Sequence, residues 1–391
     1  MFRKMPLILV AVILAIIFLD PIIPLPLKQF LYAVSLSIKS IIVMLLPFII
    51  FGLLFKAAVT LSSSATRIIG LILAFVCCSN FVSTFLSHYV GIWIFQFDLS
   101  VIAPRELTGL EPLWSLELPK VIANDKAMFA GIILGIVASK LSKDTARALA
   151  VYGEKYISSL LKGFVYFIPF FVAGFVVKLQ YDDVVGTIVK DYTTIFAVIA
   201  LAQFSYILAA YFLLSNGRIK EFANNVKNML PAAISGFSTM SSAASMPLTI
   251  IGAENNAKNK DVARSVIPAT VNIHLVGDCF AIPIFAYAVL KSYGMEEPSF
   301  INYLIFAFYF VLAKFSVAAI PGGGIIVMLP ILETYLGFSA DMMSFITALY
   351  ILFDPVITCA NVLGNGAFAK MMDRVVLLLE RWKILGYETK V

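Results

Sequence analysis

Long apolar runs recur along the whole chain, separated by short polar connections. A helix of about 20 apolar residues is long enough to cross a bilayer. With 61% hydrophobic and 13% charged residues, this 391-residue chain is also far more apolar than a soluble domain. The sequence therefore predicts an all-α integral membrane protein with room for about eight spans. The regular runs predict helices at about 6–24, 31–58, 67–94, 127–141, 157–177, 185–214 and 261–290.

Charged residues divide between the two sides of the expected membrane. Basic residues collect in one set of connections, and acidic or mixed residues in the other. The first set contains Lys140, Lys143, Arg147, Arg218, Lys220, Lys258, Lys370, Arg381 and Lys383; the second contains Asp182, Asp183, Glu296 and Glu297. This pattern is typical of positive-inside topology, so the net charge of +6 does not indicate a nucleic-acid partner. It predicts an even number of crossings with both termini in the cytoplasm.

A polar stripe interrupts the apolar run near residue 360. Asp354, Thr358, Asn361 and Asn365 follow one another at spacings that place them on one face of a helix. A carboxylate at the centre of a membrane helix costs about 2.5–3.5 kcal/mol or more. Such a group normally faces the protein interior or a water-filled path. The stripe is therefore a candidate solute site.

Two other apolar segments are interrupted by small or polar residues. The first is interrupted around Ser241 and Ser242, between arms at about 226–234 and 248–253 that are too short to cross a bilayer. The second lies at about 304–336 and contains Ile320-Pro321-Gly322-Gly323-Gly324. Non-helical backbone at membrane depth must be buried in protein or line an aqueous cavity. The pattern favours two re-entrant hairpins around a transporter's binding site; the alternative is two kinked helices.

The run at 261–290 carries a possible ion site. Thr270, His274 and Asp278 repeat every four residues and are expected to share a helix face. Pro268 and Gly277 bracket a place where this helix could open and offer carbonyl groups to a cation. An intramembrane imidazole with a carboxylate one turn away is a candidate proton site. A structural His–Asp pair or an interhelical hydrogen bond explains His274 equally well.

These features together fit an amino acid as the transported solute. Its ammonium group needs an acceptor, which Asp354 supplies. Its carboxylate needs donors, which the positive N-terminal ends of helices at the two hairpin tips supply. The predicted substrate-binding residues are Ser241, Ser242, Gly322, Gly323, Gly324, Asp354, Thr358 and Asn361.

The order of these motifs resembles the dicarboxylate/amino acid:cation symporter family, the glutamate transporters. The shared order is a serine-rich tip, a broken helix centred on Asn272, a glycine-rich tip and the Asp354 helix. Val43-Met44-Leu45-Leu46-Pro47 and the segment 130–136 are also similar to that family. The resemblance is to a bacterial-type member, which implies the bacterial cytoplasmic (inner) membrane.

The resemblance implies eight transmembrane helices plus two re-entrant hairpins, an inverted-repeat architecture and an elevator-type movement. It implies scaffold helices in residues 1–65 and 98–180. Residues 66–97 and 181–391 would form the mobile transport domain. It also implies a homotrimer.

Four of the departures from the family pattern bear on the cargo and the coupling ion. His274 and Asn365 stand where cation-binding aspartates are expected, and Ile357 and Met240 stand where an arginine would grip an acidic substrate. A second substrate carboxylate would then be buried without a partner, so a neutral amino acid is favoured. Coupling to protons or sodium, or exchange without net coupling, stays open. The coupling residues by resemblance are Thr270, Asn272, His274, Asp278, Asn361 and Asn365, with any Na+ held at Asn272, Asn361 and Asn365.

Other functions are compatible with parts of the pattern. The chain could be a symporter of acidic amino acids or dicarboxylates, another kind of permease, or a scaffold that has lost transport. Asp278 and Asp354 could instead form the dyad of an intramembrane aspartyl protease, although the two interrupted segments would then be unexplained. Four cysteines lie in apolar segments without zinc-type spacing, and no cofactor is predicted. The expected partners are a small amino acid or organic acid, the lipid bilayer and further copies of the chain.

Overall fold

The computed structural model describes residues 5–63, 67–96, 109–119, 121–181, 185–317 and 322–381. Across these residues all regular secondary structure is helical, which confirms the predicted all-α class. The described helices are α1 (Met5–Leu19), α2 (Leu25–Ser63), α3 (Arg67–Gln96), α4 (Asn124–Leu141), α5 (Lys143–Val165), α6 (Ile168–Tyr181), α7 (Val185–Leu214), α8 (Ile219–Thr239), α9 (Ser242–Asn256), α10 (Lys260–Thr270), α11 (Val276–Ser292), α12 (Phe300–Lys314), α13 (Gly323–Leu336) and α14 (Ala340–Arg381).

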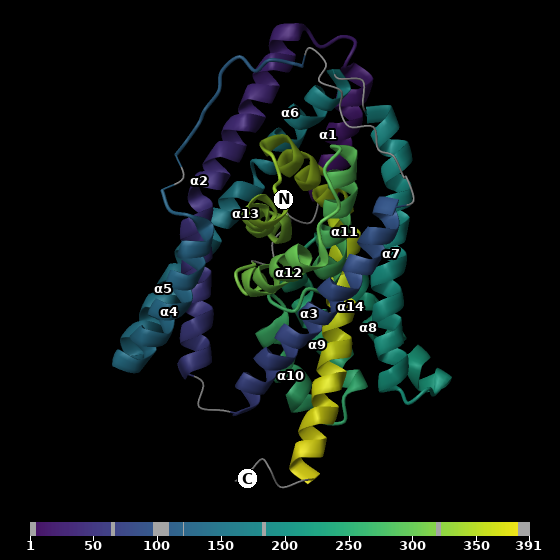
Figure 1. Cartoon of the computed structure of the whole chain (residues 1–391). Helices are drawn as coiled ribbons and strands as arrows, with labels where there is room; N and C mark the ends of the chain where they lie inside the picture. Colours follow the sequence, from purple (N-terminus) through teal and green to yellow (C-terminus); the bar gives the residue numbers. More distant parts are fainter. Residues whose placement is uncertain are drawn as a thin grey trace.

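The helices pack in two groups (Figure 1). In the first group, α2 packs against α4, α5 and α6. In the second, α11 packs against α3 and α14, and α14 also contacts α7, α8, α9 and α10. Two helix pairs, α8 with α9 and α12 with α13, fold back on each other within the second group. The long α14 runs through the middle of the molecule in Figure 1 and is the element around which this group assembles.

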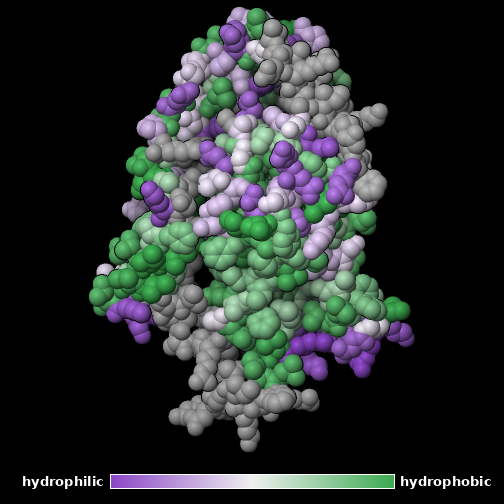
Figure 2. Space-filling view, in the orientation of Figure 1, coloured by the Kyte–Doolittle hydropathy of each residue, from purple (hydrophilic) through white to green (hydrophobic). Residues whose placement is uncertain are grey.

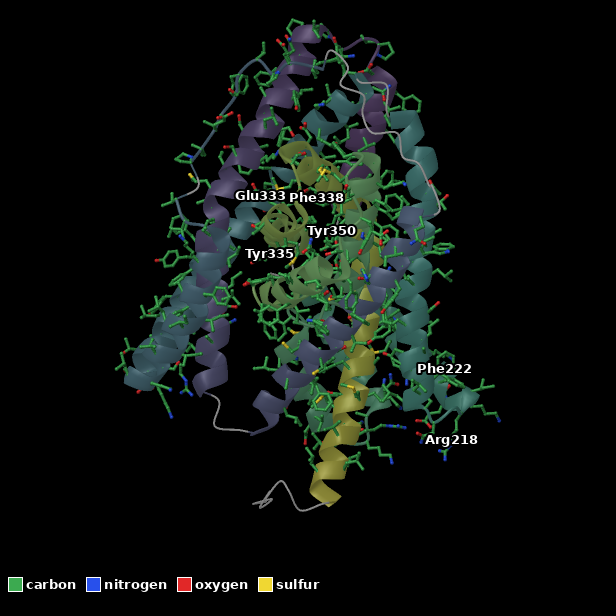
Figure 3. All side chains as sticks on the ribbon, in the orientation of Figure 1. Arg218, Phe222, Glu333, Tyr335, Phe338 and Tyr350 are labelled. Carbon is green, nitrogen blue, oxygen red and sulfur yellow. The ribbon has the colours of Figure 1, made fainter. Side chains whose placement is uncertain are left out.

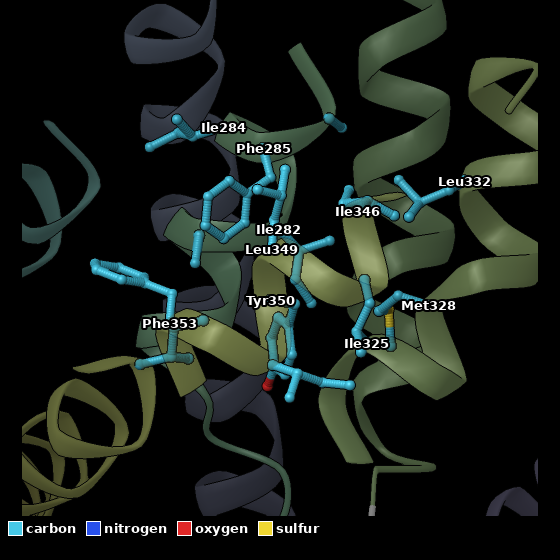
Figure 4. Packing of buried hydrophobic residues seen from close by; sticks show 14 of the residues in the cluster. Ile282, Ile284, Phe285, Ile325, Met328, Leu332, Ile346, Leu349, Tyr350 and Phe353 are labelled. Carbon is cyan, nitrogen blue, oxygen red and sulfur yellow. The ribbon is translucent and has the colours of Figure 1, made fainter. Parts of the chain in front are cut away.

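The interior of the second group is a closely packed apolar core. Almost every side chain of α11 is buried there, together with most of α13 and the middle of α14. Phe285, Ile325, Met328 and Tyr350 lie within this core (Figure 4). Phe353 stacks on Phe196 of α7 with ring centroids 4.8 Å apart. Such packing fixes the positions of α11, α13 and α14 relative to one another, and these three helices carry the candidate site.

The exterior fits a lipid environment. By length and composition, three helices of the described chain could cross a membrane: Gly70–Gln96, Tyr192–Leu214 and Asp341–Leu379. Only 22% of the most apolar window in Tyr192–Leu214 is buried, against 78% in Asp341–Leu379. The first therefore presents apolar side chains outward, and the second is a core helix. On the face shown in Figure 2, hydrophobic residues form a broad band in the lower half, with hydrophilic residues below its edges.

Several predicted helices differ from the observed ones. The run at 157–177 was expected to be one helix, but α5 ends at Val165 and α6 begins at Ile168. Pro169 explains the new start, because proline lacks an N–H group and is best accommodated in the first turn of a helix. The run at 261–290 forms two helices, α10 and α11, so the expected opening between Pro268 and Gly277 is confirmed.

The opened segment has a second consequence. Residues 271–275 are not helical, so the expectation that Thr270, His274 and Asp278 share one helix face is wrong. Part of the second glycine-rich tip, at Ile320 and Pro321, lies outside the described residues, as do Asp182, Asp183 and Lys383.

Candidate functional site

An asparagine of α3 holds the break between α10 and α11. The Nδ2 of Asn80 donates a hydrogen bond to the carbonyl of Ile273 at 2.7 Å. Its Oδ1 accepts from the N–H of Leu275 at 3.3 Å. A helix break exposes backbone groups that must find new partners when buried. Asn80, which is itself fully buried, supplies a partner for one donor and one acceptor.

Two asparagines of α14 hold the other side of the break. The Oδ1 of Asn361 accepts from the N–H of Gly277 at 2.8 Å, in the first turn of α11. The Oδ1 of Asn365 accepts from the hydroxyl of Thr270 at 2.9 Å, and its Nδ2 donates to the carbonyl of His274 at 3.1 Å. Both amide oxygens therefore already accept hydrogen bonds from the protein. The structure thus brings together the predicted residues of the broken helix and of α14.

Asp354 lies where the second glycine-rich tip meets α14. Its Oδ2 accepts from the N–H of Gly322 at 2.8 Å, and its Oδ1 accepts from the hydroxyl of Thr358 at 2.9 Å. Gly322 has a φ of 72°, a left-handed conformation that glycine adopts without steric cost, and it begins α13. The positive end of the α13 dipole therefore faces this carboxylate, which is only 3% exposed.

A second buried carboxylate, Asp278, belongs to an ion pair. Its Oδ2 lies 3.1 Å from the Nζ of Lys314, and these two side chains are 1% and 0% exposed. Its Oδ1 accepts from the Tyr350 hydroxyl at 2.8 Å and lies 3.4 Å from the Nδ2 of Asn361. The backbone of Gly324 packs closely here, because a Cβ at that position would fall 2.6 Å from Asp278 Oδ2. Tyr350 is buried and lies near the centre of the view in Figure 3.

The first interrupted segment turns at Met240 and Ser241. Met240 ends α8 with a φ of 50°, and Ser241 caps α9, its side chain accepting from the N–H of Ala244 at 3.3 Å. Near the end of α8, a Cβ on Gly236 would lie 3.3 Å from the carbonyl of Thr358. The α8 end of this pair therefore packs on the part of α14 that carries the polar stripe, and Ser242 follows as the first residue of α9.

His274 and Asp278 bind different partners. The Nε2 of His274 and the Ser79 hydroxyl of α3 form a hydrogen bond of 2.9 Å, and its ring packs 4.4 Å from that of Phe368. Asp278 instead bonds to Lys314. The buried Oδ1 of Asn272 has no hydrogen-bond partner among the described residues. Within the described ranges, no group of three or more His, Cys, Asp or Glu side chains is arranged to hold a metal ion.

Sequence reasoning missed two members of this site. Lys314 and Tyr350 lie inside apolar runs, and neither was expected to contact Asp278. A lone lysine within an apolar segment is a signal in itself, because charges inside membrane proteins are rare and normally paired. Asn80 of α3 was not assigned a role either, because its contacts with the helix break depend on the tertiary arrangement.

A separate polar pocket lies at the start of α8, near Arg218 at the lower right of Figure 3. Lys370 of α14 reaches into it and donates to Glu221 and Asn225, at 3.1 Å each. This pocket is built from residues distinct from those that surround Asp354 and Asp278.

Comparison with known proteins identifies relatives of this arrangement. A sequence model described as "Sodium:dicarboxylate symporter family" matches residues 5–375. Excitatory amino acid transporter 1 of Homo sapiens is 28% identical over 212 residues, covering 53% of this chain and 38% of that protein. Excitatory amino acid transporter 5 of Homo sapiens is 26% identical over 259 residues, covering 63% and 45%. An excitatory amino acid transporter of Onchocerca volvulus is 24% identical over 243 residues, covering 60% and 48%. Each match spans less than half of the relative's length.

Proposed function

Because the chain belongs to the sodium:dicarboxylate symporter family, we propose that it is a secondary active transporter of a small neutral amino acid. Members of this family are cation-coupled symporters rather than enzymes. Symporters act within a membrane, so the chain is an integral membrane protein. The dyad of an aspartyl protease is disfavoured for a further reason. Asp278 is ion-paired with Lys314, whereas a protease would need it free to activate water.

The observation that carries the proposal is the environment of Asp354. Among the described residues, the buried carboxylate of Asp354 accepts only from Gly322 and Thr358, so it retains lone-pair sites for an incoming ammonium group. The N-terminal end of α13 beside it offers backbone donors and a positive dipole end to the carboxylate of the same solute. Ser241 and Ser242 lie at the N-terminal end of α9, which offers a second set of backbone donors and a second positive dipole end to that carboxylate. A zwitterion satisfies both features at once.

The preference for a substrate with a neutral side chain comes from Ile357 and Met240, which stand where an arginine is expected from the family pattern. Ile357 is fully buried on α14, and Met240 is 2% exposed. Lys314 is a buried cation in the site, but its charge is already paired with Asp278. A second substrate carboxylate would therefore lack a partner, and leaving a buried charge unpaired costs about 3–5 kcal/mol.

An acidic amino acid or dicarboxylate is the second candidate. It is supported by the description of the family and by the names of the relatives, which are excitatory amino acid transporters. One structural observation also favours it: the Lys314 ammonium could exchange its pairing with Asp278 for a substrate carboxylate. The two candidates predict different ligand responses, which the experiment below separates.

We further propose elevator-type movement within a homotrimer in the bacterial cytoplasmic membrane, with both termini cytoplasmic. The packing of α2 with α4, α5 and α6 supports a scaffold in residues 1–65 and 98–180. The packing of α14 and α11 with α3 and α7–α10 supports a transport domain in residues 66–97 and 181–391, which contains both helix pairs as re-entrant hairpins. The eight-helix count belongs to this proposal.

The first experiment is a thermal-shift screen of the purified protein. A ligand that binds only the folded state at 100 times its Kd stabilises by about 2.7 kcal/mol. We expect alanine, serine or another small neutral amino acid to raise Tm, and aspartate or succinate to have no effect. A response to aspartate or succinate alone would replace the proposal with the second candidate.

The control for this screen is a matched pair of variants on α14. Asp354→Asn should abolish the response to an amino acid. Asp373→Asn changes another buried carboxylate, which accepts from the backbone N–H groups of Lys258 and Asn259 at 2.9 Å each. It should lower Tm but retain the ligand response. If Asp354→Asn shows an unchanged rise in Tm with the amino acid, Asp354 does not bind the ammonium group.

The coupling ion requires a transport assay. In proteoliposomes, uptake of the neutral amino acid should be driven by an imposed proton or sodium gradient. The residues that we assign to coupling are Thr270, Asn272, His274, Asp278, Asn361 and Asn365. Sodium-driven uptake with no pH dependence would exclude the proton version, which uses His274.

A further inference from the structure

Lys314 is the last residue of α12 and is completely enclosed by protein. Its ammonium lies 3.1 Å from Asp278 Oδ2 and 4.4 Å from the ring centroid of Phe310, in a cation–π arrangement. The side chain is 0% exposed. Burying an ion pair in this way often stabilises a protein no more than apolar side chains of the same size would. A purely structural reason for the lysine is therefore weak, and its location suggests a role in the transport site.

Among the described residues, the positive charge of Lys314 is the one that balances Asp278. The other described groups that donate to this carboxylate are the Tyr350 hydroxyl and the Asn361 amide, and both are neutral. Without the lysine, Asp278 would be a buried carboxylate facing only neutral donors among the described residues. Carboxylate, amide and carbonyl oxygens are the ligands that hard inorganic cations prefer. Removing the lysine side chain would thus leave oxygen atoms that could bind an inorganic cation.

We propose that the Lys314 ammonium is a built-in cation that takes the place of an inorganic ion beside Asp278. It has the charge of a monovalent metal ion and donates up to three hydrogen bonds. Because it is part of the chain, its effective concentration at Asp278 is fixed and independent of the sodium outside. This inference rests on the proposed transport function, since it concerns the coupling of the same site.

The ion pair also joins two parts of the structure. Lys314 ends the first helix of the α12–α13 pair, and Asp278 lies in the first turn of α11. Gly324, in the first turn of α13, packs against the same carboxylate. Docking of both helices of this pair on α11 therefore depends on a charge that the chain itself provides. We infer that this docking does not require bound sodium at Asp278.

The test replaces the lysine with an apolar side chain of similar length. In Lys314→Met, Asp278 loses its counter-charge, so Tm should fall in choline chloride and rise in a saturable way when NaCl replaces choline chloride at constant ionic strength. The unaltered protein should show no sodium-dependent rise in Tm that depends on Asp278. Lys314→Arg keeps the charge and should respond to the two salts as the unaltered protein does.

A double variant makes the result independent of whether Lys314→Met folds. Lys314→Met combined with Asp278→Asn removes both charges and should respond to sodium no more than the unaltered protein does. The proposal is overturned if the unaltered protein shows a saturable, sodium-specific rise in Tm that the double variant lacks. It is also overturned if folded Lys314→Met has the same Tm in both salts. These measurements need no transported solute. If no amino acid raises Tm in the screen, the proposed function is contradicted, but the test of Lys314 is unaffected.

Discussion

Asn365→Asp tests how the opened segment is held and why this chain has an amide at that position. In the structure, the Nδ2 of Asn365 donates to the carbonyls of His274 and Asn361, at 3.1 and 2.9 Å. An ionised carboxylate cannot donate, so the substitution would place a negatively charged oxygen against two carbonyl oxygens. The hydroxyl of Thr270 can still donate to the other oxygen. The change alters one functional group and leaves the size of the side chain almost unchanged.

The energetic cost follows from these contacts. Each of the two lost hydrogen bonds contributes about 0.5–1.5 kcal/mol. The new carboxylate would also be an uncompensated charge at a position with 0% exposure, and such a charge costs about 3–5 kcal/mol. We therefore expect the free energy of unfolding to fall by at least about 3 kcal/mol in the absence of a suitable cation.

Sodium should reverse part of this loss. The carboxylate, the two carbonyls and the Thr270 hydroxyl would form a set of oxygen ligands around a position where a cation relieves the repulsion. Sodium at 100 times its Kd would restore about 2.7 kcal/mol. The assay is Tm in NaCl against choline chloride at equal ionic strength. Asn365→Ala loses the same hydrogen bonds without adding charge, so it should be destabilised in both salts alike.

The result that refutes this reasoning is specific. If Asn365→Asp is as stable as the unaltered protein in choline chloride, the hydrogen bonds from Nδ2 do not hold the break between α10 and α11. If it is destabilised but sodium has no more effect than choline, the oxygens around this position do not form a cation site.

Two further predictions concern packing and pH. Gly324→Ala should lower the free energy of unfolding by about 1–3 kcal/mol, because its Cβ would lie 2.4 Å from the Tyr350 hydroxyl; Gly153→Ala, whose Cβ would meet nothing within 4 Å, should leave Tm unchanged or higher. The hydrogen bond from Lys370 holds the pKa of Glu221 below its ordinary value of 4.5. The pair therefore stabilises the fold above that pH and loses this contribution as the pH falls below it. Glu221→Gln should lower Tm slightly at neutral pH and should make Tm fall less steeply as the pH drops below 4.5. An unchanged dependence of Tm on pH in this acid range would contradict the assignment.

Much of the fold could be predicted because apolar length and helix breakers act locally. The run at 185–214 predicted α7 with the bounds that the structure shows. The opening in the run at 261–290 was predicted from Pro268 and Gly277, and it occurs between α10 and α11. The break before Pro169 was missed because a proline in an apolar run does not always end a helix: Pro355, for example, lies inside α14.

The site was only partly predictable, because spacing identifies a helix face but does not identify the groups that face it. The stripe on α14 does place Asp354 and Thr358 together, and they share a hydrogen bond. The spacing of His274 and Asp278 was misleading, since it assumed helical backbone where the chain is open. Their partners, Ser79 and Lys314, come from α3 and α12 and are far away in the sequence.

Specificity can be tested at the position where the arginine of the family is missing. Ile357 is 0% exposed and lies on α14 one turn from Asp354, so Ile357→Arg would bury a guanidinium group beside the proposed ammonium site. Without a counter-ion this charge should destabilise the protein by about 3–5 kcal/mol. A substrate with a second carboxylate can supply that counter-ion, whereas alanine cannot.

The variant should therefore be stabilised more by aspartate or succinate than by alanine, measured as the rise in Tm at equal ligand concentration. Ile357→Leu preserves volume and should respond as the unaltered protein does. If Ile357→Arg responds to alanine alone, residue 357 does not face the substrate. The absence of an arginine there would then be no argument for a neutral cargo, and the acidic candidate would regain equal standing.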